Sequence, residues 1–209
     1  MNSLDVAYGI PAGRNIIDIV RVDVLEQHEP PEAPYPAHYL TTVLTKDEVR
    51  VPVRPIKPED APFLVDFFNR LSKETISFRY LANLKSLPKE WLPHLTQVDA
   101  SLSVAMVAVK EIESRERILG ECRIMRKPGS TRGEIAATVE DQWQDKGLGT
   151  GLVRHCICIA KELGIKVIWG SVSSDNTRVF ALADKLGFSC RKDPRTELFE
   201  TELNLAADI

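Results

Sequence analysis

The stretch "EDQWQDKGLGTGLVRHC", residues 140–156, has three glycines within five positions and then continues as an apolar, helix-like segment. These glycines are Gly147, Gly149 and Gly151. The N-terminus of a helix leaves several backbone N–H groups without partners and carries a partial positive charge. Because glycine has no side chain, a phosphate group can approach these N–H groups closely. The stretch therefore predicts a pyrophosphate-binding loop, and a tight turn with close helix packing is the alternative that needs no ligand.

Two common glycine loops fit this stretch poorly. A P-loop requires Lys and then Ser or Thr directly after its last glycine, whereas Leu152 and Val153 follow Gly151. The dinucleotide fingerprint G-x-G-x-x-G has leucine at its last position here, at residue 152. That fingerprint also follows the first strand of a βαβ unit, but the segment before this loop reads as part of an antiparallel meander.

The periodicity around the loop predicts a mixed α/β domain and not a doubly wound sheet. Three successive segments joined by hairpins, residues 101–111, 116–127 and 133–140, indicate antiparallel strands. The remaining elements, in chain order, are two extended segments within 38–56, a helix at 61–72, two short helices within 72–99, a helix at 149–164 that stops at Gly164, a strand at 166–173, a helix at 176–187, and strands at 188–193 and 198–205.

The chain has 209 residues, of which 44% are hydrophobic, enough for one well-buried domain plus an appendage. Residues 1–38 are assigned to an N-terminal extension of unknown role, and residues 39–209 to the domain. Within the extension, "IIDIVRVDVL" (16–25) has the composition of a strand, whereas four prolines in "EQHEPPEAPYPAH" (26–38) exclude a regular helix or ladder.

Composition also narrows the function class. The formal net charge is -3 and basic residues are scattered, which argues against a nucleic-acid partner. No apolar run reaches the ~20 residues that span a bilayer, and no signal peptide begins the chain, so we expect a cytoplasmic protein without a membrane partner. The cysteines form no CxxC pair; we expect no disulfide framework, no zinc or other metal, and buried free thiols at Cys122, Cys156, Cys158 and Cys190.

The segment Gln144-Asp145-Lys146-Gly147-Leu148-Gly149 resembles the pyrophosphate loop of the GNAT superfamily of acyl-CoA N-acyltransferases. The resemblance extends over about residues 51–205 and includes "NTRVFALADKLGF" (176–188). It implies a GNAT fold, in which a central, mostly antiparallel sheet is flanked by helices and splayed between the fourth and fifth strands. It also implies acetyl-CoA as co-substrate. Segments 53–80, 92–99 and 140–152 resemble the acetyltransferase domain of bacterial Pat-type protein lysine acetyltransferases.

The same resemblance implies which residues hold acetyl-CoA. The pantetheine arm runs beside the strand that precedes the loop, and the pyrophosphate lies on the loop itself. Asn176 resembles the asparagine that the family places against the cofactor, with an ordinary helix N-cap as the alternative. The implied cofactor-binding residues are Ala137, Thr138, Val139, Gln144, Asp145, Lys146, Gly147, Leu148, Gly149, Thr150 and Asn176.

Acyl transfer to an amine requires a neutral nitrogen, whereas a lysine amine with a pKa near ~10.4 is almost wholly protonated at neutral pH. A carboxylate in a partly desolvated cleft can accept the proton. The resemblance points to Glu134 as this catalytic base, with Glu140 and Asp141 as alternatives. Many relatives carry a Tyr that protonates the leaving thiolate, but Ala183 stands at that position here. His155 and Cys156, the nearest other donors, read as ordinary helix side chains.

Several acceptors of the acetyl group are compatible with this sequence. We expect an N-acetyltransferase that acetylates a protein lysine; a small-molecule amine acceptor, or a non-catalytic acetyl-CoA sensor, are the alternatives. A homodimer is possible. Phe78, Tyr80 and Trp91 lie in the segment before the meander, where they can line an acceptor cleft or belong to the core.

Overall fold

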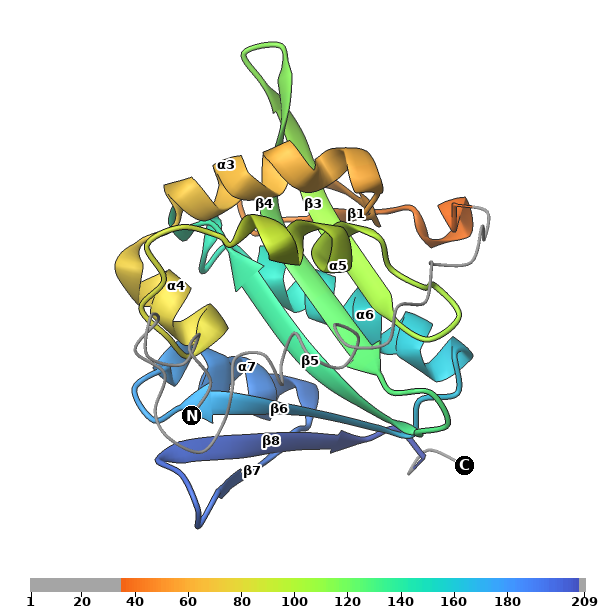
Figure 1. Cartoon of the computed structure of the whole chain (residues 1–209), viewed down its shortest axis with the longest axis vertical. Helices are drawn as coiled ribbons and strands as arrows, with labels where there is room; N and C mark the ends of the chain where they lie inside the picture. The colour runs from red at the N-terminus through yellow and green to blue at the C-terminus, as the bar shows by residue number, and fades with distance from the viewer. Residues whose placement is uncertain (1–34, 207–209) are drawn as a thin grey trace.

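The computed structural model describes residues 35–206, and within them eight strands form one sheet (Figure 1). The strands are β1 (Thr41–Leu44), β2 (Arg50–Pro55), β3 (Val104–Ile112), β4 (Arg115–Arg126), β5 (Arg132–Val139), β6 (Val167–Ser173), β7 (Ser189–Lys192) and β8 (Leu198–Asn204). The helices are α3 (Ala61–Arg70), α4 (Lys73–Tyr80), α5 (Leu92–Thr96), α6 (Leu148–Glu162) and α7 (Thr177–Leu186), with short 3-10 helices η1 (Ala37–Tyr39), η2 (Pro58–Asp60), η3 (Lys89–Trp91) and η4 (Asp141–Trp143).

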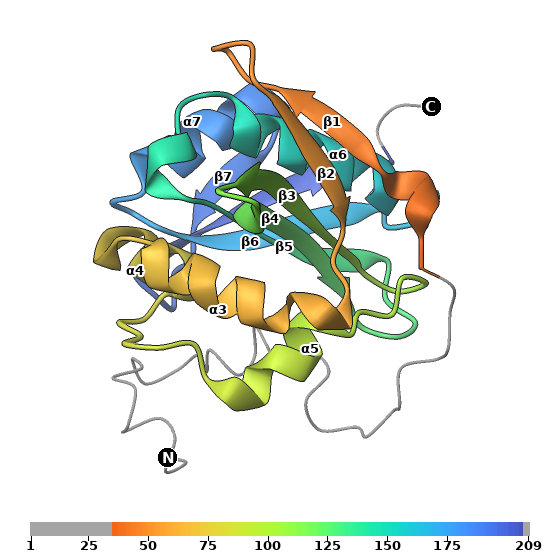
Figure 2. The ribbon, with the colours of Figure 1, turned by 90° about the horizontal axis from the view of Figure 1, so that it is seen from above.

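The sheet is covered by helices on both faces, which confirms the predicted mixed α/β fold. The strand order is β1-β2-β3-β4-β5-β6-β8-β7, and neighbouring strands are antiparallel except for β5 and β6. Helices α3, α4 and α5 lie on one face, and α6 and α7 lie on the other (Figures 1 and 2). The meander of three antiparallel strands predicted before the glycine loop is β3-β4-β5.

The sheet is splayed between β5 and β6, as the family resemblance implies. The two strands pair over three positions only, from Arg132↔Val167 to Glu134↔Trp169. Beyond this point β5 continues to Val139 and β6 to Ser173 without pairing to each other. The sheet therefore opens into a fork whose base lies at Glu134.

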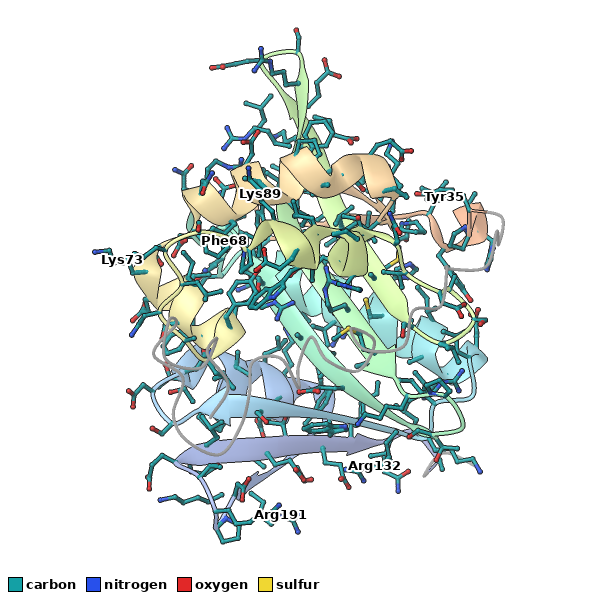
Figure 3. The ribbon with its side chains drawn as sticks, in the orientation of Figure 1. Tyr35, Phe68, Lys73, Lys89, Arg132 and Arg191 are labelled. Atoms are coloured by element: carbon teal, nitrogen blue, oxygen red, sulfur yellow. The ribbon has the colours of Figure 1, made fainter. Side chains whose placement is uncertain are left out.

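Two hydrophobic cores hold the helices to the sheet, because successive strand side chains point to opposite faces. Met106 and Ala108 of β3 belong to the core under α6, whereas Val107 and Val109 belong to the core under α3, α4 and α5. Phe68 of α3 lies in the second of these cores (Figure 3). Both faces of the central strands are thus buried.

A buried ionic cluster joins α4 to β4 within the second core. Arg79 donates through Nε (3.1 Å) and Nη2 (3.0 Å) to Oε1 of Glu121. Arg123 donates through Nη2 to the other carboxylate oxygen, Oε2, at 2.5 Å. Burial by itself raises the pKa of the Glu121 carboxyl, but the guanidinium groups of Arg123 and Arg79 outweigh it and lower this pKa to about 2. The cluster fixes the position of α4, the helix that faces the fork.

The low pKa of Glu121 predicts a loss of stability in acid. Because the folded-state pKa lies below the ordinary value of 4.5, the stabilisation is complete above about pH 4.5 and is lost as the pH falls towards about 2. Glu121→Gln leaves two buried guanidinium groups without their anion and should cost ~3–5 kcal/mol at pH 7. Denaturant unfolding at several pH values checks both effects. Glu116→Gln, at a carboxylate with 41% side-chain exposure, is the control and should change little.

Only part of the cysteine prediction is confirmed. Cys122 and Cys156 are buried free thiols, but Cys158 and Cys190 are free and exposed. Cys158 lies on the outer face of α6, two residues after Cys156, and Cys190 belongs to the edge strand β7, whose residues are all exposed. The described residues contain no cluster of His, Cys, Asp and Glu suited to a metal ion.

The first described residues already pack on the domain. The Tyr35 hydroxyl donates a hydrogen bond of 2.9 Å to the Pro55 carbonyl, and η1 follows at Ala37–Tyr39. Domain contacts therefore begin before residue 39, inside the segment assigned to the extension. Residues 1–34 of that extension, including the strand predicted at 16–25, lie outside the described residues.

Gly151 holds α6 close to β1. A Cβ at this position would lie 2.5 Å from Val43 Cγ1 and 2.7 Å from Cγ2, too close for any real contact. We expect Gly151→Ala to destabilise the fold by ~1–3 kcal/mol through overpacking, and Val43→Ala in the same chain to recover part of that loss. Thermal and denaturant unfolding measure both. No recovery in the double variant would contradict this packing role.

Candidate functional site

A cleft of about 410 Å³ follows the fork between β5 and β6. Its walls come from five elements that are far apart in sequence: β5, the glycine loop with the start of α6, β6, α7 and α4. The cleft passes the base of the fork at Glu134 and reaches the glycine loop at Gly147. One continuous groove therefore joins a buried carboxylate to the start of a helix.

The glycine loop presents backbone donors to this cleft. Gly147 is the N-cap of α6 and has a φ of 86°, a left-handed conformation that glycine adopts without strain. The first helical bond runs from the Gly151 N–H to the Gly147 carbonyl, so the N–H groups of residues 148–150 have no partner within the helix. A Cβ on Gly149 would meet only Val139 Cγ2, at 3.4 Å. The protein leaves the surface over this turn open, which fits a pyrophosphate.

Side chains from distant segments hold the loop in place. Gln144 Nε2 donates to the Val139 carbonyl (2.9 Å), and Arg178 Nη1 of α7 donates to Gln144 Oε1 (2.7 Å). On the other side, Lys46 of the β1–β2 turn donates through its backbone N to the Lys146 carbonyl (2.8 Å) and through Nζ to the Asp145 carbonyl (2.8 Å). Gln144 of the motif therefore acts as a bridge between β5 and α7.

Most of the cofactor residues expected from the sequence line the cleft. Two do not: Leu148 is fully buried in the core, so only its backbone is available, and Lys146 pairs with Asp47 at 3.0 Å. The residues that line the cleft are Ala137, Thr138, Val139, Gln144, Asp145, Gly147, Gly149, Thr150 and Asn176.

The cations that line the cleft include Lys46 and Arg178, which sequence reasoning missed. Both lie against the glycine loop, where positive charge favours a phosphate. Lys46 is 99 residues from its hydrogen-bond partner Asp145, so no local pattern signals it. Arg178 stands two residues after Asn176, and its place in the first turn of α7 was the available signal.

Asn176 caps α7 and also lines the cleft. Its side chain accepts a hydrogen bond from the Val179 N–H at 3.2 Å, which makes it the N-cap of α7. The same residue is buried and lines the cleft opposite β5. The N-cap role therefore does not remove it from the site.

The candidate base and its alternatives have different environments. Glu134 is 7% exposed, lines the cleft and stands at the last paired position before the strands separate. Glu140 does not line the cleft and is paired with Arg70 (3.1 Å) and Arg117 (3.4 Å). Of the three carboxylates, only Glu134 faces the groove.

Asp141 does not line the cleft either and instead binds the start of α4, whose N-cap is Ser72. It accepts hydrogen bonds from the Ser72 backbone N–H (2.9 Å), the Ser72 hydroxyl (2.7 Å) and the Thr75 hydroxyl (2.8 Å). Burial raises the pKa of this carboxyl, but the hydrogen bonds from Ser72 and Thr75 outweigh burial and lower it. A carboxylate held ionised in this way is a poor proton acceptor at neutral pH.

The other residues considered from sequence divide between cleft and core. Ala183 lines the cleft, so no hydroxyl stands there. His155 Nε2 contacts the Tyr39 carbonyl at 2.8 Å, and neither it nor buried Cys156 reaches the cleft. Tyr80 is buried in the core with Trp91 packed against it, whereas Phe78 lines the cleft.

The fold and the cleft define an enzyme that binds a phosphorylated co-substrate along a split sheet. A family model for the acetyltransferase (GNAT) domain matches residues 50–189. An acetyltransferase of Pseudomonas aeruginosa is 32% identical over 148 residues, which cover 71% of this chain and 80% of that protein. The chain therefore belongs to the GNAT family of acetyltransferases, and its acetyl donor is acetyl-CoA.

Pat-type proteins are among the relatives. The acetyltransferase Pat of Mycolicibacterium smegmatis is 25% identical over 136 residues, 65% of this chain and 40% of that longer protein. The GNAT domain of Streptomyces lividans Pat superposes with a TM-score of 0.75 and 24% identity, covering 82% of this chain and 99% of that one. A Salmonella typhimurium structure with acetyl-CoA has a TM-score of 0.60 and 16% identity, covering 77% and 97%. Within residues 35–206, no helix is long and apolar enough to cross a membrane.

Gly149→Leu tests the loop with a bulky side chain. The first carbon of that side chain meets only Val139 Cγ2 in the protein, at 3.4 Å, so the rest of it lies over the open surface of the turn. There it covers the N–H groups of the first turn, so acetyl-CoA affinity should fall about 10- to 150-fold, as for the loss of hydrogen bonds to a charged group. Calorimetric titration with acetyl-CoA measures the affinity, and unfolding curves supply the control. Unchanged affinity would show that the phosphates lie elsewhere.

Proposed function

We propose that this protein transfers the acetyl group of acetyl-CoA directly to a lysine amine of another protein, with Glu134 as the general base. The observation that carries this proposal is the position of Glu134, which lines the cleft at the base of the fork. An amine that reaches this point lies next to a proton acceptor and at the end of the groove that starts at the glycine loop.

In this proposal, different residues of the groove bind different parts of acetyl-CoA. The N–H groups at the start of α6 take the pyrophosphate, with Lys46 and Arg178 contributing positive charge on either side of the loop. Beyond its last pair with β6 at Glu134, and before the Val139 carbonyl that accepts from Gln144, β5 offers backbone N–H and C=O groups to the pantetheine amides. The thioester is thereby directed towards Glu134.

Glu134 removes the proton that prevents attack. It is buried and lines the cleft, so its carboxylate is positioned to accept a proton from an amine at the base of the fork. The neutral amine then forms a C–N bond to the thioester carbon, and a backbone N–H of β5 stabilises the negative oxygen that results. The C–S bond breaks, and the electron pair leaves with the CoA sulfur.

The leaving thiolate needs no protein acid in this proposal. The cleft presents Ala183 where many relatives carry a tyrosine, and His155 and Cys156 are engaged elsewhere. A thiolate is a good leaving group at neutral pH, so water is sufficient as the eventual proton donor.

A protein acceptor is favoured by the similarity to Pat-type proteins over several separate segments. A small-molecule amine uses the same cofactor groove and the same base, because acceptor identity is set outside them. The two acceptors, and a sensor that binds acetyl-CoA without transferring it, are therefore separated by a direct assay.

The assay uses acetyl-CoA labelled on its acetyl group, a soluble cell extract and a mixture of small amines. Label on protein lysines, identified by mass, is the expected result. Label on a small amine alone would show that the acceptor is a small molecule and not a protein. Binding of acetyl-CoA without transfer would favour the sensor.

Glu134→Gln should slow transfer about 10²- to 10⁴-fold, the range for loss of a general base, with little change in acetyl-CoA affinity. Glu140→Gln is a matched control outside the cleft. Turnover equal to wild type would remove Glu134 from the mechanism.

A further inference from the structure

The Thr75 hydroxyl joins α4 to the segment that leads into the glycine loop. Thr75 is buried and lines the cleft. Its hydroxyl donates a hydrogen bond of 2.8 Å to Asp141 Oδ1 and accepts one of 3.2 Å from Gln144 Nε2. Because these partners are 66 and 69 residues away in sequence, only the folded chain brings them together.

A hydroxyl is the side-chain group that fits between these two partners. An ionised carboxylate accepts hydrogen bonds and an amide nitrogen donates them, so the group at position 75 must donate to Asp141 and accept from Gln144. Threonine and serine do both, whereas valine, which has nearly the shape of threonine, does neither. The contact with the loop segment therefore uses the chemistry of Thr75 and not its shape alone.

The amide of Gln144 has partners on all sides. Its two N–H groups donate to the Val139 carbonyl (2.9 Å) and to the Thr75 hydroxyl, and its oxygen accepts from Arg178 Nη1 of α7 (2.7 Å). A guanidinium only donates and a carbonyl only accepts, so one orientation of the amide satisfies these partners. Turning the amide over would place its oxygen against the Val139 carbonyl. Thr75 supports the favoured orientation from the side of α4.

The helix that carries Thr75 is itself fixed near both ends. At its start, the Ser72 backbone N–H and hydroxyl donate to Asp141 at 2.9 and 2.7 Å. Near its end, Arg79 is held in the buried cluster by Glu121. Thr75 is therefore a rigid point from which the Gln144 side chain can be positioned.

The hydrogen bonds through Gln144 connect the two helical layers of the domain. Arg178 belongs to α7 and Thr75 to α4, and these helices lie on opposite faces of the sheet (Figure 2). Gln144 stands between them, directly before Asp145 and the glycine loop. The start of the loop is thus held by both helical walls of the cleft as well as by β5.

We propose that Thr75 is a positioning residue for acetyl-CoA: its hydroxyl holds the Gln144 amide, and through it the glycine loop, in the geometry that binds the cofactor. The inference rests on the acetyl-CoA groove of the proposed function, but not on Glu134 or on the identity of the acceptor. Thr75 acts on the binding of acetyl-CoA and leaves the chemical step unchanged.

Loss of the Thr75 hydroxyl leaves one N–H of the Gln144 amide without its acceptor. Because Gln144 lines the cleft, that N–H turns towards water in the space that acetyl-CoA occupies. The bonds from Gln144 to Val139 and from Arg178 to Gln144 weaken as the amide turns. Acetyl-CoA must then restore the arrangement when it binds, which lowers its affinity.

Calorimetric titration of the full chain with acetyl-CoA, without any acceptor, measures this effect. Thr75→Val should weaken binding about 2- to 10-fold, as for the loss of one hydrogen bond between uncharged groups. Thr75→Ser keeps the hydroxyl and should bind close to wild type. In a transfer assay, Thr75→Val should raise the KM for acetyl-CoA by the same factor with kcat unchanged.

Thr96→Val is the matched control. The Thr96 hydroxyl is also buried and donates to the Leu92 carbonyl at 2.8 Å, but Thr96 belongs to α5 and does not line the cleft. This variant should lose stability without losing affinity for acetyl-CoA. Denaturant unfolding of each variant measures the stability and shows that the chain folds.

A second variant tests whether Thr75 acts through Gln144. Gln144→Leu removes the amide, so Thr75→Val should cause no further loss of affinity in that background. Additive losses would mean that Thr75 contacts acetyl-CoA itself, and they would overturn the positioning role.

The outcomes separate this inference from the proposed function. Weaker binding in Gln144→Leu with unchanged binding in Thr75→Val would overturn the role of Thr75 alone. Equal losses in Thr75→Val and Thr75→Ser, or in Thr75→Val and Thr96→Val, would also overturn it, because the hydroxyl or its place would then not matter. Unchanged binding in Gln144→Leu would overturn the part that the proposed function gives to the glycine loop, and the role of Thr75 with it.

Discussion

Parallel strands β5 and β6 pair at three positions and then separate, and this separation creates the cleft. A strand that ends its pairing inside a sheet leaves backbone N–H and C=O groups without partners, which is costly unless water or a ligand satisfies them. On its other side β5 remains fully paired with β4 as far as Val139. The free edge is therefore held straight by β4 while it faces the groove, so the groove is formed before any ligand arrives.

The base and the open end of the fork are fixed by different interactions. At the base, Gly170 of β6 approaches the Ile135 carbonyl so closely that a Cβ would lie 3.0 Å from it. At the open end, the glycine loop is kept in place by Lys46 and Gln144. Close packing sets where the strands begin to part, and hydrogen bonds from remote segments set where the helix start lies. The distance between base and phosphate site follows from both.

Carboxylates near the cleft show how environment selects function. Glu121 is paired with two guanidinium groups and stays ionised down to about pH 2. Asp141 binds the N-cap of α4, Ser72, and Glu140 is paired with Arg70 and Arg117. Glu134 is the one of these four that lines the groove. All four side chains are carboxylates that differ by at most one methylene group. Their different contacts therefore come from their positions in the fold and not from their residue types.

Local patterns in the sequence determined the order of helices and strands, the antiparallel meander and the glycine loop, because periodicity and glycine spacing act over a few residues. The motif from Gln144 to Gly149 also indicated the family, and the expected cleft residues on β5 and the loop were found there with Leu148 and Lys146 as exceptions. Side-chain direction explains both exceptions: Leu148 turns into the core at the start of α6, and Lys146, before the helix, turns towards Asp47 and the Trp143 ring.

Tertiary structure alone decided the contacts between remote segments. Lys46 meets Asp145 across 99 residues, Gly151 meets Val43 of β1, and Trp169 faces Glu134 across the fork. The exposure of Cys158 and Cys190, and the contact of Asp141 with Ser72, likewise depend on which neighbours the fold supplies. Sequence patterns specify the face of each element, whereas strand register and helix packing specify which faces meet; the second step depends on long-range contacts that no local pattern contains.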